Sequence, residues 1–178
     1  MCAARILIAD DHDVVRRGLR ALIQEQPSWQ IVAEVQDGRS AVAKTQELKP
    51  DVAILDIGMP SLNGLDATSQ IVKVNPDTKV LILTMHDSEQ LIQNVLNAGA
   101  RGYLMKSDAN RDLVAVVRAL LLGQTFFTQK VAQIVLDGFT GKRTATTESE
   151  FQQLTPREKS CNCSLKVRVA RKPRTFSM

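Results

Sequence analysis

The sequence predicts an α/β fold in which a five-stranded parallel sheet is doubly wound by helices. Short apolar runs rich in Ile, Val and Leu recur at fairly even spacing. Segments with helical periodicity lie between them, and each carries one apolar stripe. Unbroken apolar runs of this length are typical of strands buried on both faces of a parallel sheet. Five strand–helix units in about 120 residues therefore favour a single sheet with right-handed crossovers.

Local signals justify the elements in turn. The strands are expected at 6–9, 31–35, 52–55, 80–83 and 103–105. Three of the helical stretches are each followed by a proline, namely Pro27, Pro50 and Pro76. The fourth helix has two further signals. Asp87, with Gln90 three residues later, resembles a capping box, and Gly99 can end the helix in a left-handed conformation.

The composition is that of an ordinary soluble domain with part of a second one. The chain has 178 residues, 44% of them hydrophobic and 24% charged. No apolar run approaches the roughly 20 residues of a membrane span, so no membrane partner is expected. Three cysteines, Cys2, Cys161 and Cys163, cannot form a disulfide framework and suit a reducing compartment. We therefore expect a cytoplasmic protein.

Polar residues follow four of the predicted strands at the point where each strand ends. Asp10 and Asp11 come after the first strand and Asp56 after the third. Thr84 follows the fourth strand and Lys106 the fifth. The carboxyl ends of parallel strands meet at one edge of the sheet, where such sheets bind ligands. Three carboxylates, a hydroxyl and an ammonium group are thus expected to share one pocket.

This combination of groups predicts a metal site beside a phosphoryl acceptor. Three carboxylates about 5 Å apart repel by roughly 3 kcal/mol per pair at an effective dielectric constant near 20. Lys106 offsets part of this repulsion, and an all-oxygen site without His or Cys favours Mg²⁺ for the rest. Asp56 is the expected nucleophile. Mg²⁺ and Lys106 would neutralise the transferring group, and Thr84 could donate a hydrogen bond to the product.

Four segments resemble the receiver domain of bacterial two-component response regulators. They are ILIADDHDVVRRGL at 6–19, VAILDIGMPSLNGLD at 52–66, LILTMHD at 81–87 and GARGYLMKSD at 99–108. The resemblance implies a flavodoxin-like receiver over residues 1–122 with strand order 2-1-3-4-5. It also implies a bacterial protein whose partner is a sensor histidine kinase and which can form a homodimer on phosphorylation.

The resemblance implies a role for each matching residue around the metal. Asp56 is the phosphoacceptor, Asp11 ligates Mg²⁺ directly, and Asp10 supports the metal through water. The backbone carbonyl of Gly58, two residues after Asp56, completes the protein ligands. Mg²⁺ is the one cofactor expected.

The remaining roles concern the phosphoryl group and the switch. Thr84 and Lys106 are expected to contact the phosphoryl group, and Tyr103 is the switch aromatic that rotates inward when Thr84 moves. His12 and His86 are interpreted as exposed loop residues. The protein is thus expected to be a phosphoacceptor regulator that assists its own Mg-dependent phosphorylation and dephosphorylation, rather than an enzyme with a separate substrate.

The C-terminal part of the chain predicts a linker and a disordered basic tail. Residues 123–153 are expected to form a linker with a short helix. LTPREK at 154–159 resembles the start of a LuxR-type helix-turn-helix domain, but no amphipathic helix follows it. Residues 157–178 carry seven Lys or Arg against one Glu, and residues 160–178 cannot build a core.

Three interpretations of this tail are open. Cys161 and Cys163 are fewer than the usual ligands of a zinc site. The basic cluster can bind nucleic acid without sequence preference. Alternatively, a frameshift near Ser160 replaced the rest of the domain, because synonymous codons exist whose second frame encodes a string similar to the missing helices.

The frameshift hypothesis leads to the main functional prediction. The protein is then a LuxR-type (NarL/FixJ-like) response regulator of transcription, whose full-length form binds DNA while this chain does not. The alternatives are a stand-alone receiver that acts by protein–protein contact and a nonspecific nucleic-acid binder.

Overall fold

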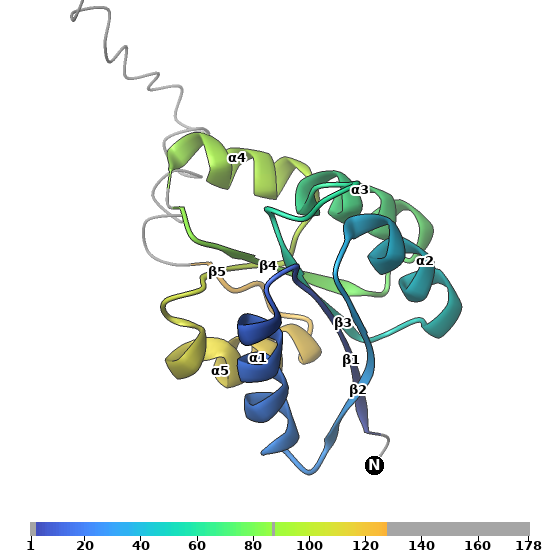
Figure 1. Ribbon diagram of the computed structural model, residues 1–178, viewed down its shortest axis with the longest axis vertical. Helices are drawn as coiled ribbons and strands as arrows, with labels where there is room; N and C mark the ends of the chain where they lie inside the picture. The colour runs from blue at the N-terminus through green and yellow to red at the C-terminus, as the bar shows by residue number, and fades with distance from the viewer. Residues whose placement is uncertain (1–2, 87, 128–178) are drawn as a thin grey trace, which may run out of the picture. The chain divides into compact units, whose positions relative to one another are not determined.

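Five strands alternate with five helices in residues 3–86 and 88–127, the part of the chain that this computed structural model describes (Figure 1). The strands are β1 (Ala4–Ala9), β2 (Trp29–Val35), β3 (Val52–Asp56), β4 (Lys79–Thr84) and β5 (Gly102–Met105). The helices are α1 (Asp13–Gln24), α2 (Gly38–Leu48), α3 (Gly64–Val74), α4 (Glu89–Asn97) and α5 (Ala109–Leu121). Each predicted strand lies within an observed one.

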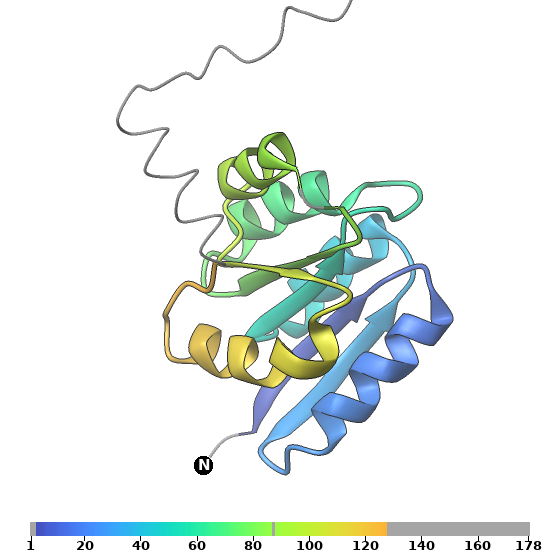
Figure 2. The same ribbon diagram turned by 90° about the vertical axis from the view of Figure 1, so that its left-hand side faces the viewer.

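The strands form one parallel sheet with the order β2-β1-β3-β4-β5. Helices α1 and α5 cover one face of this sheet, and α2, α3 and α4 cover the other (Figures 1 and 2). The predicted doubly wound fold and its strand order are both confirmed. The order reverses between β1 and β3, so the carboxyl ends of these two strands open onto the crevice where such sheets bind ligands.

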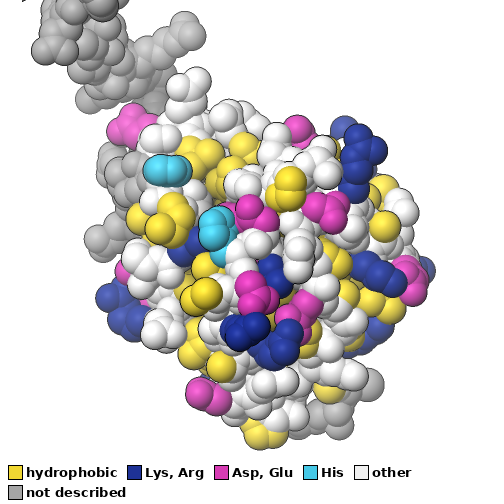
Figure 3. Space-filling model, in the orientation of Figure 1, with side chains coloured by type: hydrophobic (Ala, Val, Ile, Leu, Met, Phe, Trp, Pro, Cys, Tyr) yellow, Lys and Arg dark blue, Asp and Glu magenta, His cyan; other side chains and the backbone are white. Residues whose placement is uncertain are grey.

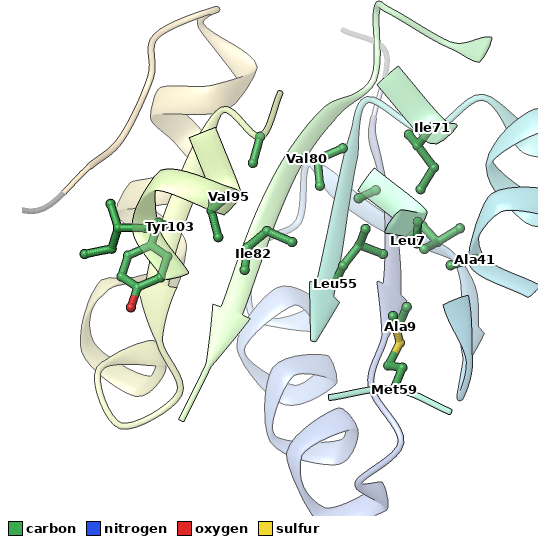
Figure 4. Packing of buried hydrophobic residues seen from close by; sticks show 14 residues of the cluster. Leu7, Ala9, Ala41, Leu55, Met59, Ile71, Val80, Ile82, Val95 and Tyr103 are labelled. Atoms are coloured by element: carbon green, nitrogen blue, oxygen red, sulfur yellow. The ribbon is translucent and has the colours of Figure 1, made fainter. Parts of the chain in front are cut away.

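Successive residues of a strand pack alternately into two separate cores, one on each face of the sheet. This alternation explains the unbroken apolar runs in the sequence. Leu7, Leu55 and Ile82 pack under α2, α3 and α4, where Figure 4 shows them together. Ile8 and Ile54 are the chain neighbours of Leu7 and Leu55, and they pack on the other face of the sheet against α1 and α5. Every residue from Val52 to Asp56 is buried. Because side chains alternate across a strand, a strand covered on both faces must be apolar throughout.

Two local predictions need correction. The start of α4 was predicted at Asp87, but the cap is Ser88, whose hydroxyl accepts a hydrogen bond from the Leu91 N–H at 3.3 Å. Asp87 itself lies outside the described residues. The edge strand β2 is mostly half-buried rather than buried, because it pairs on one side only, whereas the other edge strand, β5, also pairs with Phe126. The predicted end of α4 is confirmed, since Gly99 has a φ of +89°.

The chain pairs with the sheet again after α5. Phe126 forms a parallel bridge to Gly102, and its N–H donates to the Arg101 oxygen at 3.0 Å. The compact α/β fold thus extends at least to this residue. The predicted linker helix, the LTPREK segment and the basic tail lie outside the described residues and stay predictions. Among the described helices, none is long and apolar enough to cross a membrane.

Candidate phosphoacceptor site

The ends of four elements bring the predicted polar residues to one edge of the sheet. Asp10 follows β1, and Asp56 and Thr84 are the last residues of β3 and β4. Lys106 follows β5, and its N–H donates to the Thr84 oxygen at 2.8 Å. On this face of the molecule an acidic side chain lies directly beside a histidine (Figure 3). Asp10, Asp11, Asp56 and Lys106 together are called the acidic pocket below.

Lys106 bridges two carboxylates inside the acidic pocket. Its Nζ lies 2.8 Å from Asp10 Oδ2 and 2.8 Å from Asp56 Oδ2. The three side chains are almost wholly buried, with 5%, 1% and 6% exposed. Burial by itself lowers the pKa of Lys106, but the close contacts with Asp10 and Asp56 outweigh it and raise the pKa above its ordinary value. The lysine therefore stays charged at neutral pH.

One ammonium group leaves the acidic pocket with net negative charge. Asp10 Oδ1 accepts a hydrogen bond from the His12 N–H at 2.9 Å, and Asp10 Oδ2 is paired with the Lys106 ammonium group. The Asp11 side chain is 33% exposed and faces the same space. Buried carboxylates of this density need a cation, so the donor set fits a divalent ion held by oxygen ligands.

His12 belongs to this site, although its sequence context did not indicate so. Its side chain is 63% exposed, as predicted, but its Nδ1 lies 2.7 Å from Asp11 Oδ1 and 3.3 Å from Asp10 Oδ1. The interpretation of His12 as only a loop residue is therefore incomplete. A histidine directly after two strand-end aspartates is the signal that could have placed it there.

Arg16 is a second residue that the sequence analysis missed. It lies in α1 and is 7% exposed. Its guanidinium donates to the Asp10 backbone oxygen at 2.8 Å and to the Asp13 carboxylate at 2.8 Å. The side chain thus ties the loop that carries Asp10 and Asp11 to the first turn of α1. The apolar stripe of the predicted helix gave no reason to expect a buried arginine in it.

Two glycines shape the loop after β3. Gly58 lies beside the carboxyl end of the strand, where a Cβ atom would be 3.6 Å from Asp56 Oδ2. Gly64 starts α3 so close to β3 that a Cβ atom would lie 2.0 Å from the Asp56 backbone oxygen. Only a residue without a side chain fits the second position, which fixes α3 against the strand that presents Asp56.

Thr84 and Tyr103 meet at one backbone oxygen. The Thr84 hydroxyl donates to the His86 oxygen at 3.2 Å and accepts from the His86 N–H at 3.1 Å. The Tyr103 hydroxyl donates to the same oxygen at 3.0 Å. Tyr103 is 1% exposed and packs beside Ile82 and Val95 (Figure 4). In this conformation Tyr103 is already turned inward, and the Thr84 hydroxyl contacts the loop before α4. His86 itself is exposed, as predicted.

A parallel sheet with paired carboxylates and a bridging lysine at its carboxyl edge defines an aspartate-based receiver. Comparison with known proteins agrees: the response regulator receiver domain matches residues 6–118. The chain belongs to this family, whose members are two-component response regulators.

Individual relatives point to one branch of the family. The oxygen regulatory protein NreC of Staphylococcus carnosus is 39% identical over 158 residues, which cover 86% of this chain and 73% of that protein. A LuxR-family two-component response regulator from Aurantimonas is 33% identical with a TM-score of 0.71, covering 78% of this chain and 99% of that one. The RcsB response regulator of Salmonella typhimurium is 26% identical with a TM-score of 0.70, covering 80% of this chain and 72% of that one.

The chain is therefore similar to LuxR-family response regulators that control transcription, as the resemblance implied. Response regulators of this family are partners of sensor histidine kinases and bind DNA, and the family is generally not enzymatic.

Proposed function

We propose that Asp56 accepts a phosphoryl group from a phosphohistidine of a sensor kinase. The observation that carries this proposal is the Lys106 ammonium group, which lies 2.8 Å from both Asp10 and Asp56 on a side chain that is 5% exposed. A carboxylate oxygen of Asp56 attacks the phosphorus, the P–N bond breaks, and the imidazole leaves with its electron pair. Membership of the response regulator family supports this reaction.

Lys106 has the charge and position that the transferred group requires. The phosphoryl group brings nearly two negative charges to Asp56. Because its pKa is raised by the two carboxylates, Lys106 is a cation throughout and pairs with the phosphoryl oxygens as they arrive. The same ammonium group stabilises the phosphorylated aspartate afterwards.

The carboxylates of Asp10, Asp11 and Asp56, with the backbone oxygen of Gly58, would hold Mg²⁺. Their fit to a cation rests on the crowded carboxylates, whose donor atoms lie within 4.8 Å of one another and which one lysine does not neutralise. When bound, Mg²⁺ supplies positive charge to the oxygens of the transferring phosphoryl group. Asp11 would be a direct ligand, and Asp10 would act through water. The same groups would assist dephosphorylation.

Thr84 and Tyr103 would report the state of Asp56. Both hydroxyls donate to the His86 oxygen in the present conformation. When Asp56 carries a phosphoryl group, the Thr84 hydroxyl would turn toward it and leave that oxygen to Tyr103. The loop before α4 would then change position, and with it the surface of α4, β5 and α5 that a dimer partner or an output domain contacts.

Phosphorylation in vitro tests this proposal. The purified protein is incubated with Mg²⁺ and a small phosphodonor such as acetyl phosphate, and its intact mass is measured. The mass should rise by one phosphoryl group, and Asp56→Asn should abolish the gain. Asp77→Asn is the matched control, because Asp77 is an exposed aspartate outside the acidic pocket. An equal gain in Asp56→Asn would assign the acceptor to another residue.

The residues that bear on DNA binding lie outside the described part of the chain. We propose that a frameshift near Ser160 replaced the residues after LTPREK with an out-of-frame segment, so that residues 160–178 do not form DNA-reading helices. Resequencing the gene tests this idea, which fails if the second frame does not encode a helix-turn-helix segment. Salt-sensitive binding to any DNA sequence, lost on deletion of residues 160–178, would instead favour the basic tail as a nonspecific binder.

A further inference from the structure

The chain continues past α5 into a short segment that lies along the outer edge of β5. The Gly123 N–H donates to the Leu120 oxygen at 2.9 Å. The Gln124 N–H donates to the Ala119 oxygen at 3.0 Å, which completes a Schellman turn at the end of the helix. Gly123 has a φ of +78°, which glycine adopts without strain. The turn sends the chain back to the sheet (Figure 2). Residues 124–127 are called the strap below.

Backbone hydrogen bonds attach the strap to β5. The Phe126 N–H donates to the Arg101 oxygen at 3.0 Å, and the Phe126 oxygen accepts from the Tyr103 N–H at 3.2 Å. Phe126 thus forms a parallel bridge with Gly102, while the other side of β5 pairs with β4. The strap therefore occupies the edge of the strand that carries Tyr103, the proposed switch residue.

The two phenylalanines of the strap pack on opposite faces of the sheet. Phe126 packs against the buried cluster under α1 and α5, and Phe127 packs against the cluster under α2, α3 and α4. This second cluster contains Tyr103 together with Ile92 and Val95 of α4. Both phenylalanines are half-buried. Phe127 therefore shares one packed cluster with the switch residue and with α4.

Packing of this kind is sensitive to small displacements of α4. A gap of about 0.5–1 Å between packed atoms forfeits a quarter to a half of their dispersion attraction. The Thr84 hydroxyl holds the loop before α4 through the N–H and the oxygen of His86. A turn of Thr84 toward a phosphoryl group on Asp56 would release this loop. A shift of α4 would then loosen Phe127 and weaken the attachment of the strap.

We propose that the strap is a regulatory element, fastened to β5 while Asp56 is unphosphorylated and detached when Asp56 carries a phosphoryl group. The inference rests on the proposed phosphorylation of Asp56 and names the segment that its effect reaches. The strap lies within residues 123–153, which the sequence predicts as a linker, so its release frees the first part of that linker. Because coupling between two sites is reciprocal, a weakened strap also favours ligand binding at Asp56.

Amide hydrogen exchange of the full chain, followed by nuclear magnetic resonance, tests the proposal without any variant. Beryllium fluoride with Mg²⁺ serves as the stable mimic of a phosphoryl group on Asp56. The N–H groups of Tyr103 and Phe126 both take part in the attachment of the strap. They should exchange at least about fivefold faster with beryllium fluoride than with Mg²⁺ alone. The Val52 N–H is the control, because β3 pairs on both sides, and its exchange should not accelerate.

The variant Phe127→Ala tests the coupling in the reverse direction. Its affinity for beryllium fluoride in the presence of Mg²⁺, measured by calorimetry, should be at least about fivefold higher than that of the wild type. Leu122→Ala is the matched control, because Leu122 lies just before the strap and is 77% exposed. It should bind beryllium fluoride as the wild type does. If Phe127→Ala does not fold, as judged by circular dichroism, the exchange measurement on the wild type decides.

The possible results separate this inference from the proposed function. If beryllium fluoride binds the wild type but the exchange of Tyr103 and Phe126 does not accelerate, the strap is only structural, and the phosphorylation of Asp56 stands without it. If exchange accelerates but folded Phe127→Ala binds no more tightly than Leu122→Ala, the coupling through Phe127 is refuted. If beryllium fluoride does not bind the wild type, the proposed acceptor and this inference both fail.

Discussion

Replacing Lys106 by Met tests whether its ammonium group stabilises the acidic pocket. The variant keeps much of the side-chain volume but removes the charge that lies 2.8 Å from both Asp10 and Asp56. Each contact is worth about 6 kcal/mol of attraction at an effective dielectric constant of 20. Most of this gain offsets the cost of burying the charges, so we expect a loss of about 3–5 kcal/mol in the free energy of unfolding, as for broken buried ion pairs.

The same arithmetic predicts that Asp56→Asn is far milder. Neutralising Asp56 gives up one attraction of about 6 kcal/mol to Lys106. It also removes repulsion from Asp10 and Asp11, which lie within 4.8 Å and contribute at least about 3.5 kcal/mol each. These effects nearly cancel. The Asp56→Asn protein should therefore match the wild type to within about 1 kcal/mol, and it should partly rescue Lys106→Met.

Urea unfolding in buffer with a chelator, followed by circular dichroism, measures both effects without bound metal. Lys44→Met is the control, because its ammonium group also lies 2.8 Å from a carboxylate, that of Glu47, but both side chains are exposed. It should cost at most about 1 kcal/mol. If Lys106→Met were no less stable than Lys44→Met, the ammonium group would not be what compensates the buried carboxylates.

The difference between the wild type and Lys106→Met should also depend on pH in one direction. The pKa of Lys106 is raised in the folded protein. Its stabilising effect is then complete below its ordinary pKa of 10.5 and is lost as the pH rises through the higher folded value. The gap should stay constant through the neutral range and narrow only in strong alkali. A gap that already narrows near neutral pH would contradict the raised pKa.

Three further predictions concern residues around the acidic pocket and at a helix start. Arg16→Gln should lower the free energy of unfolding by about 1.5–3 kcal/mol, which is the value of hydrogen bonds to charged groups. Arg17 is exposed, so Arg17→Gln should lower it by less than about 1 kcal/mol. Equal effects of the two variants in urea unfolding would refute the role of burial. Gly64→Ala should destabilise by at least about 1–3 kcal/mol and slow phosphorylation measured by mass, because its Cβ would lie 2.0 Å from the backbone oxygen of the proposed acceptor; an unchanged rate would show that the loop adapts. Asp37→Ala should cost about 1 kcal/mol at neutral pH, since this residue caps α2. The pKa of Asp37 is lowered by its hydrogen bonds with the side chain and backbone of Ser40. The loss of stability in Asp37→Ala should therefore shrink as the pH drops below 3.8. A loss that stays constant in acid would show that the cap does not depend on the charge of Asp37.

The positions of Asp10, Asp56, Thr84 and Lys106 could be predicted from the sequence because they depend on topology alone. Apolar runs set the strands, parallel order brings their carboxyl ends together, and the next polar residue in each case reaches the same edge. The strand order was predicted from the receiver resemblance and not from these patterns. Capping was less predictable, because Asp87 and Ser88 are both good helix caps and one residue of strand–helix geometry decides between them.

The sequence by itself determined the fold class and the carboxylates at the sheet edge, since both follow from short-range patterns of apolar and polar residues, whereas the strand order was implied by the receiver resemblance. Only the tertiary structure decided that Arg16 is buried under the first loop, that His12 joins the carboxylates, and that Thr84 and Tyr103 share the His86 oxygen. These contacts depend on distances of a few ångströms between side chains of different elements. A sequence pattern indicates the face of a helix or strand on which a residue lies. It does not indicate the rotamers and loop conformations that bring two such faces into contact.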